Sequence, residues 1–214
     1  MLRYARFDPM FLVLWTLAIV PAIVLHEFAH ALVAYRLGDP TPRYDGRLSL
    51  NPRAHLDPIG ALMLFLFGFG WARPVNVNPA YFRNGRRGMM LVALAGPLAN
   101  VTLAWLASLL LQVMAGLGAG GALFSDLSAA VRQFLSLSLQ INLLLAAFNL
   151  IPIPPLDGSR ILAGLVPTRQ AVAIARLESY GPLLLVLLIM SGVTQVLLEP
   201  IYRLLWMLIG AGRL

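Results

Sequence analysis

The chain of 214 residues contains no cysteine and no lysine, and only 12% of its residues are charged. Without cysteine it forms no disulfide and offers no thiolate, so His, Asp or Glu must hold any bound metal. With so few charges it has too little polar surface to cover a water-soluble globule. Arginine carries all the basic charge behind the net +7, and no soluble basic and aromatic module is present. We therefore expect contact with anionic lipid headgroups and no nucleic-acid partner.

Apolar residues are abundant, at 59% of the chain. The uncharged runs 88–125 and 133–156 exceed the roughly 20 residues that a helix needs to cross a bilayer, and 179–198 just reaches that length. With the apolar stretch 10–35 they make at least four crossings. Segment 58–72 is apolar too, but as a helix it would extend only about 22 Å, less than the roughly 30 Å hydrocarbon core. We expect it to enter the lipid bilayer and return.

The predicted fold is an all-α membrane protein, a polytopic bundle of about four to six transmembrane helices in a single domain, 1–214. The polar, turn-rich residues 43–53 include Tyr44-Asp45-Gly46-Arg47, a sequence typical of a β-hairpin turn. A helix break is expected at Glu199-Pro200. The expected elements are a helix over 10–37, a hairpin over 43–53, a re-entrant segment over 58–72, a helix over 88–115, a helix over 127–150, a segment over 152–166 and a C-terminal helix over 181–208.

His26, Glu27 and His30 form a His-Glu-Phe-Ala-His sequence within the first apolar stretch. Ionisable groups are costly in hydrocarbon, so their presence there indicates a functional site. On a helix the two histidines share one face and can bind one metal ion, while Glu27 can reach a water on that metal. A catalytic zinc needs a third protein ligand. The best candidate is Asp157, which follows three prolines that unwind the preceding helix, and the chain is interpreted as a membrane-embedded zinc hydrolase with one Zn²⁺.

The expected membrane topology depends on segment 58–72. If that segment returns, eleven of the sixteen arginines lie on one side, which the positive-inside bias makes cytosolic. The same arrangement lets the polar residues of separate membrane segments converge, namely His26, His30, Asn100, Asn149 and Asp157. If the segment crosses instead, Asp157 moves to the opposite face from the histidines. Metal binding and the arginine distribution therefore predict the same topology, a multi-pass cell-membrane protein with its site on the cytosolic side.

Three motifs in order carry a family resemblance: H-E-x-x-H at 26–30, G-P-x-x-N at 96–100 and N-x-x-P-x-x-P-L-D-G at 149–158. Together they resemble the site-2 protease family of intramembrane zinc metalloproteases, in its compact prokaryotic group without PDZ or CBS domains. The resemblance covers about residues 21–165.

The resemblance implies that His26, His30 and Asp157 hold zinc and that Glu27 is the catalytic acid and base. It also implies a re-entrant β-hairpin after the first motif and an active site that faces the cytosol. The expected function is that of a zinc metalloendopeptidase. It would cut single-span, membrane-anchored proteins within or near their transmembrane segments and release a regulator to the cytosol.

Several side chains have two interpretations. Asn100 and Asn149 either bind the substrate backbone or its developing oxyanion, or make an interhelical hydrogen bond and a helix cap, respectively. His55 is either a further ligand or proton shuttle, or an interfacial residue that caps segment 58–72. Arg160 either neutralises Asp157 or extends to lipid headgroups.

The rival function is a metal-ion transporter that uses the same His and Asp cluster, since such residues also mark ion pathways in membranes. In a transporter Glu27 would be a ligand or a relay, so Glu27→Gln would weaken metal binding. In a protease the same substitution would leave the zinc bound and stop turnover. A catalytically inactive chaperone of membrane helices would bind no zinc.

Overall fold

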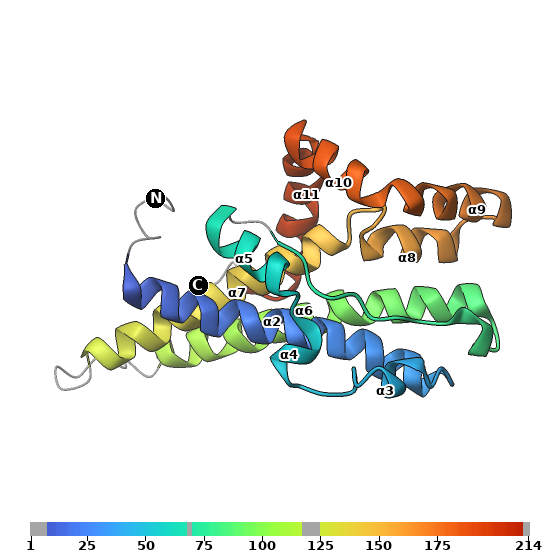
Figure 1. Ribbon diagram of the computed structural model, residues 1–214. Helices are drawn as coiled ribbons and strands as arrows, with labels where there is room; N and C mark the ends of the chain where they lie inside the picture. The colour runs from blue at the N-terminus through green and yellow to red at the C-terminus, as the bar shows by residue number, and fades with distance from the viewer. Residues whose placement is uncertain (1–7, 68–69, 117–124, 212–214) are drawn as a thin grey trace.

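Three long helices form the centre of the protein, whose computed structural model describes residues 8–67, 70–116 and 125–211. They are α2 (Pro9–Arg36), α6 (Gly85–Gly116) and α7 (Ser125–Asn149), and each packs against the other two (Figure 1). All three are long and apolar enough to cross a membrane, and a bent pair of helices at 168–190 would make four spans if it counts as one. The predicted all-α class is confirmed, and the predicted four to six spans are reached only with this pair.

Small side chains lie where the long helices meet. Lipid chains are as apolar as leucine, so membrane helices associate through close packing, which small residues permit. The buried alanines of the three long helices are Ala18, Ala22, Ala31, Ala34, Ala93, Ala104, Ala107, Ala146 and Ala147. The C-terminal helix α11 (Val193–Leu208) adds Leu205 to the cluster between α6 and α7.

A short helix after α7 carries the predicted aspartate. This helix, α8 (Asp157–Leu165), packs against α6 and leads into α9 (Thr168–Leu177). The Arg86 side chain at the start of α6 donates to the carbonyls of Gly164 and Val166 at 3.2 and 2.5 Å. Arg86 therefore satisfies carbonyls at the end of α8 and fixes that end to α6.

The helix ends follow the sequence closely, with two differences. α6 begins three residues before its predicted start because Asn84 caps it, accepting from the Arg87 amide at 3.1 Å. The predicted C-terminal helix 181–208 is two helices, α10 (Gly181–Met190) and α11. They are separated at Gly192, whose φ of +74° is left-handed, whereas Pro200 lies inside α11. The predicted interruption at Glu199-Pro200 is therefore wrong.

Residues 43–53 do not form the predicted β-hairpin. They belong to α3 (Thr41–Tyr44), α4 (Pro52–His55) and the turns between them. Each short helix has a proline in its first turn and an upstream carboxylate or amide that accepts a backbone amide: Asp39 from Thr41 and Asn51 from Arg53, both at 3.0 Å. These local bonds replace the ladder of a hairpin. Within 8–67, 70–116 and 125–211 there is no strand.

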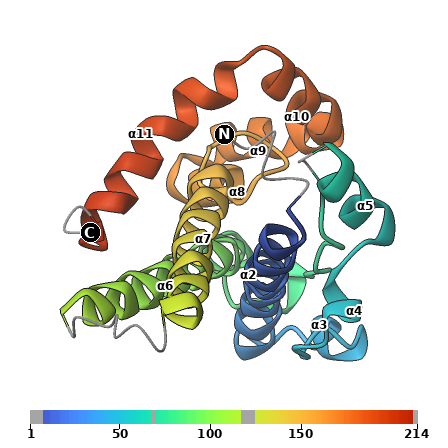
Figure 2. The ribbon, with the colours of Figure 1, turned by 90° about the vertical axis from the view of Figure 1, so that its left-hand side faces the viewer.

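The two ends of the predicted re-entrant segment lie side by side. A single antiparallel β-bridge pairs Leu56 with Ala72, and the Arg73 amide donates to the His55 carbonyl at 2.8 Å. Between these two points lies α5 (Pro58–Phe67). Figure 2 shows α5 and α11 on opposite sides of the three-helix bundle.

Candidate metal centre

Both histidines of the first motif lie on the inner face of α2 and are buried. The His30 Nδ1 lies 2.7 Å from the Val92 carbonyl oxygen on α6. A carbonyl can only accept, so Nδ1 carries the hydrogen and the Nε2 of the neutral ring presents a lone pair. That is the form in which histidine binds a metal.

An asparagine network fixes the second ring in the same form. The Asn100 amide nitrogen donates to the Ala22 carbonyl at 3.1 Å and to Asn142 Oδ1 at 2.8 Å. Asn100 Oδ1 therefore faces His26 Nδ1, 2.6 Å away, and accepts its hydrogen. Asn100 is fully buried and both of its amide hydrogens are used, so it holds His26 and has no donor for a substrate. The structure thus favours the interhelical interpretation of Asn100 over the predicted substrate contact.

Asn142 is the network member that the sequence did not reveal. It is 1% exposed, and its own amide nitrogen donates to the Ser138 carbonyl one turn earlier at 2.8 Å. The available signal was an amide between Ile141 and Leu143, within the uncharged run 133–156. Such an amide is costly in a membrane helix unless it has partners, and here its partner holds a metal ligand.

Asp157 reaches the histidines because the chain breaks after α7. Pro152, Pro154 and Pro155 prevent the helix from continuing, and α8 begins at Asp157 itself. The next residue must be small: a Cβ on Gly158 would lie 2.4 Å from the carbonyl oxygens of both Leu150 and Ile151. Because Gly158 has no side chain, the first turn of α8 can pack directly against the backbone that follows α7.

Three potential ligand atoms converge at this point. His26 Nε2 and His30 Nε2 are 3.0 Å apart, and they lie 3.1 and 3.2 Å from Asp157 Oδ2. Asp157 Oδ2 is buried and accepts no hydrogen bond.

These atoms fit a zinc ion. Tetrahedral ligands about 2.0 to 2.2 Å from zinc are about 3.3 to 3.6 Å apart, slightly more than the three separations here. Lone pairs that face one another in a buried space repel unless a cation lies between them. Two imidazoles and one carboxylate, with no thiolate anywhere in the chain, form one of the ligand sets of catalytic zinc.

α6 approaches the two rings through a glycine. A Cβ on Gly96 would lie 2.5 Å from His30 Nε2 and 2.6 Å from His26 Nε2. Any larger residue would displace the rings or push α6 away from α2. Gly96 of the second motif is therefore required by packing against the metal ligands, beyond any bend that Pro97 introduces.

The other candidate residues lie around this centre. Glu27 is half-buried on α2 and is not a member of the three-residue cluster. Asn149 donates to the Leu145 carbonyl of its own helix at 3.0 Å, as expected of a cap at the end of α7. His55 is fully buried and bonds the Ser49 carbonyl at 2.6 Å, away from the metal cluster. Arg160 Nε pairs with Glu178 Oε1 at 2.7 Å, a partner that the sequence analysis did not propose.

Comparison with known proteins agrees with this centre. Residues 124–191, which include Asp157, match the family described as peptidase family M50. The Bacillus subtilis (strain 168) protein named "Putative zinc metalloprotease YwhC" is 39% identical over 197 residues, covering 92% of this chain and 86% of the relative. The Mycobacterium tuberculosis (strain Erdman) protein named "Putative zinc metalloprotease Rip2" is 33% identical over 171 residues, covering 73% of this chain and 62% of the relative.

A more distant relative is the Methanocaldococcus jannaschii protein named "Putative zinc metalloprotease MJ0611", 27% identical over 74% of this chain and 74% of its own. No solved structure matches the chain significantly. The similarity to the Bacillus protein extends over nearly the whole of both chains, well beyond the motifs. The chain therefore belongs to peptidase family M50, the site-2 protease family.

Proposed function

We propose that this chain is a zinc-dependent endopeptidase that acts as one domain in the membrane and cuts membrane-anchored proteins within or near their transmembrane segments. The observation that carries the proposal is the convergence of His26, His30 and Asp157 within 3.2 Å from two distant parts of the chain. Each ligand atom is left free to bind a cation, and one Zn²⁺ per chain is proposed. Family membership supports hydrolysis as the reaction.

In this proposal His26, His30 and Asp157 hold the ion, and Glu27 is the acid and base. Bound zinc acidifies a coordinated water and polarises a carbonyl group. Glu27 takes a proton from the water as its oxygen bonds to the scissile carbonyl carbon, and then gives a proton to the amine as the C–N bond breaks. No hydrogen bond to the Glu27 carboxylate occurs within the described ranges, so the carboxylate is available for this role.

The proposed substrates are single-span membrane proteins, and release of a regulator to the cytosol is the proposed outcome. A helical substrate hides its carbonyls in internal hydrogen bonds, so it must unwind before it can be cut. Asn149 is proposed to contact the unwound backbone, since the structure gives no partner to its Oδ1 in the described residues. Asn100 is instead assigned to the positioning of His26.

The transporter interpretation is not favoured. It needs Glu27 as a ligand or relay, and the cluster of possible ligand atoms contains His26, His30 and Asp157 without Glu27. Membership of a peptidase family points the same way.

The decisive experiment compares the wild-type protein with Glu27→Gln in detergent, using a panel of single-span proteins and mapping the products by mass. We expect the wild type to cleave at least one member and Glu27→Gln to retain stoichiometric zinc with turnover lower by about 10²-fold or more. Equal cleavage by both proteins would reject Glu27 as the base. A wild-type protein without stoichiometric zinc at neutral pH would reject the metalloprotease.

A further inference from the structure

Arg47 is a buried charge in the connection between α2 and α5. Only 3% of its surface is exposed, although it lies in a polar, turn-rich part of the chain. Its guanidinium donates to two backbone carbonyls, those of Ala54 and Arg73. Taking a guanidinium out of water is costly, so a position like this one indicates a role that an exposed arginine does not have.

Arg47 joins two passes of the chain. Residues 45–57, which we call the strap, run along α2 before the re-entrant segment begins. The Ala54 carbonyl belongs to the strap, and the Arg73 carbonyl lies where the re-entrant segment returns. The bridge from Leu56 to Ala72 joins the same two passes. The Arg47 guanidinium therefore links the turn after α3 to both ends of the re-entrant segment that contains α5.

The strap lies next to the helix that carries the metal ligands. α4, which forms part of the strap, packs against α2 (Figure 1). Burial lowers the pKa of the Arg47 guanidinium from its usual value, and the Glu27 carboxylate is the strongest influence in the opposite direction.

We propose that Arg47 is a positioning residue, which holds the strap and the two ends of the re-entrant segment against α2, the helix that carries Glu27, and so keeps the reaction site in its working shape. This proposal rests on the proposed protease function. The planar fork of arginine donates in two directions at once, and the single ammonium of lysine does not reproduce this geometry. Lysine at position 47 keeps the charge but loses one of the two carbonyl contacts.

The first test measures zinc content and cleavage for Arg47→Lys and Arg47→Ala. We expect both to keep one zinc per chain and to cleave at least about tenfold more slowly, because displacement of a site wall by about 1 Å can cost up to 10²-fold. The matched control is Arg53→Ala, which removes an exposed arginine from the same strap and should leave turnover unchanged. Added guanidinium ion should restore part of the activity of Arg47→Ala and none to Glu27→Gln.

The second test does not depend on catalysis. Because the chain has no cysteine, spin labels can be placed at Leu50→Cys in the strap and Leu91→Cys on α6, both at exposed positions. We expect one narrow distance distribution with Arg47 or with Arg53→Ala, and a broader or shifted one with Arg47→Lys.

The two tests separate this proposal from the proposed function. Wild-type turnover in both Arg47 variants, or an unchanged label distribution in Arg47→Lys, would overturn the role of Arg47. If the wild type cleaves nothing, the protease function fails, while the label distances still decide whether Arg47 holds the strap. If Arg47→Ala does not fold, Arg47→Lys answers both questions.

Discussion

One backbone oxygen and one side-chain oxygen determine which ring nitrogen carries the hydrogen in each of the two histidines. The Val92 carbonyl holds the hydrogen of His30 Nδ1, and Asn100 Oδ1 holds that of His26 Nδ1. Both rings therefore direct a lone pair at Asp157 without any need for a metal to orient them. Such outer contacts raise the basicity of the ligand and reduce the entropy lost when the metal binds.

Asn142→Leu should weaken zinc binding although residue 142 is not a ligand. Without the Asn142 oxygen, one amide hydrogen of Asn100 is buried without a partner, and Asn100 no longer holds His26 in place. Loss of such an outer partner typically lowers metal affinity by about 10 to 100-fold. Competition with a fluorescent chelator measures the change, and Gln140→Leu, at an exposed position on the same helix, is the control. Equal affinities in the two variants would contradict the network.

The sequence predicted the metal ligands, but it did not predict the hydrogen-bond partners that hold the surrounding side chains in place. The spacing of His26 and His30 and the proline break before Asp157 are local patterns with a direct geometric meaning. Asn142 has no such pattern, because an amide in an apolar helix can pair with any neighbouring helix. Arg160 shows the same limit: its partner Glu178 comes from the turn after α9, which the sequence did not predict.

α6 meets the two imidazoles of α2 at Gly96. Because Gly96 has no side chain, the rings of His26 and His30 pack directly against the backbone of α6, and this close packing keeps the metal centre compact. The helices themselves were predictable because long uncharged runs have few alternatives in a bilayer.

Gly96→Ala should disturb the metal centre more than its size suggests. The new methyl group would lie 2.5 Å from His30 Nε2, so either the ring or α6 must move, and zinc content should fall well below one per chain. Gly116→Ala, on the same helix but with nothing within 4 Å of the new Cβ, should keep full zinc content and equal or greater thermal stability. Full zinc occupancy in Gly96→Ala would show that the close contact does not constrain the ligands.

The failed hairpin shows why polar connections are harder to predict than spans. Tyr44-Asp45-Gly46-Arg47 matches a turn in composition, but Arg47 and the Asp39 and Asn51 caps satisfy the backbone instead of a neighbouring strand. Nothing in the local sequence states which carbonyls a long side chain will reach. The break at Gly192 was missed for a related reason, because a glycine in an apolar run is compatible with a continuous helix as well as with a turn.

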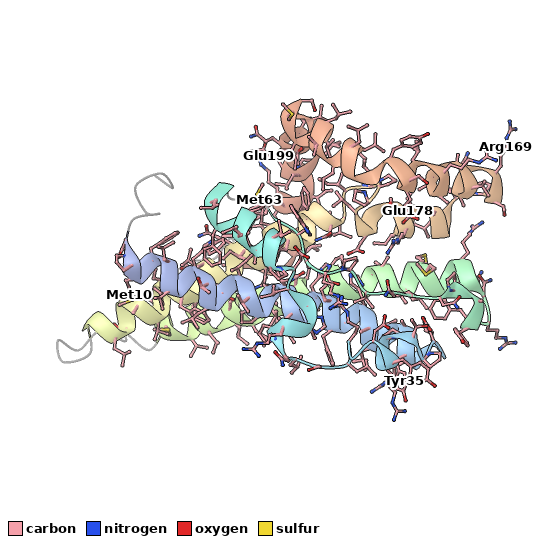
Figure 3. All side chains as sticks on the ribbon, in the orientation of Figure 1. Met10, Tyr35, Met63, Arg169, Glu178 and Glu199 are labelled. Carbon is pink, nitrogen blue, oxygen red and sulfur yellow. The ribbon has the colours of Figure 1, made fainter. Side chains whose placement is uncertain are left out.

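The molecule has two distinct ends along its long helices. Met10 and Tyr35 mark the opposite ends of α2, and Arg169 lies at the Tyr35 end (Figure 3). The connection between α2 and α6 begins and ends at the Tyr35 end (Figure 1). We propose that this end faces the cytosol, in line with the positive-inside bias.

Labelling of single cysteines tests this orientation in a chain that has none of its own. Tyr44→Cys, at a position 82% exposed in α3, should react with a membrane-impermeant maleimide in inside-out vesicles and be protected in intact cells. Leu127→Cys, at the opposite end of the bundle and 65% exposed, should show the reverse pattern. Reaction of Tyr44→Cys from outside intact cells would invert the proposed topology.

The separation of the ligands along the chain has a consequence for biosynthesis. His26 and His30 enter the membrane early in translation, whereas Asp157 leaves the ribosome only after α6 and α7 have been made. A nascent chain therefore has an incomplete set of ligands until α8 docks. We expect newly made molecules to be inert toward neighbouring proteins at the translocon, with activity appearing only once the last third of the polypeptide has folded.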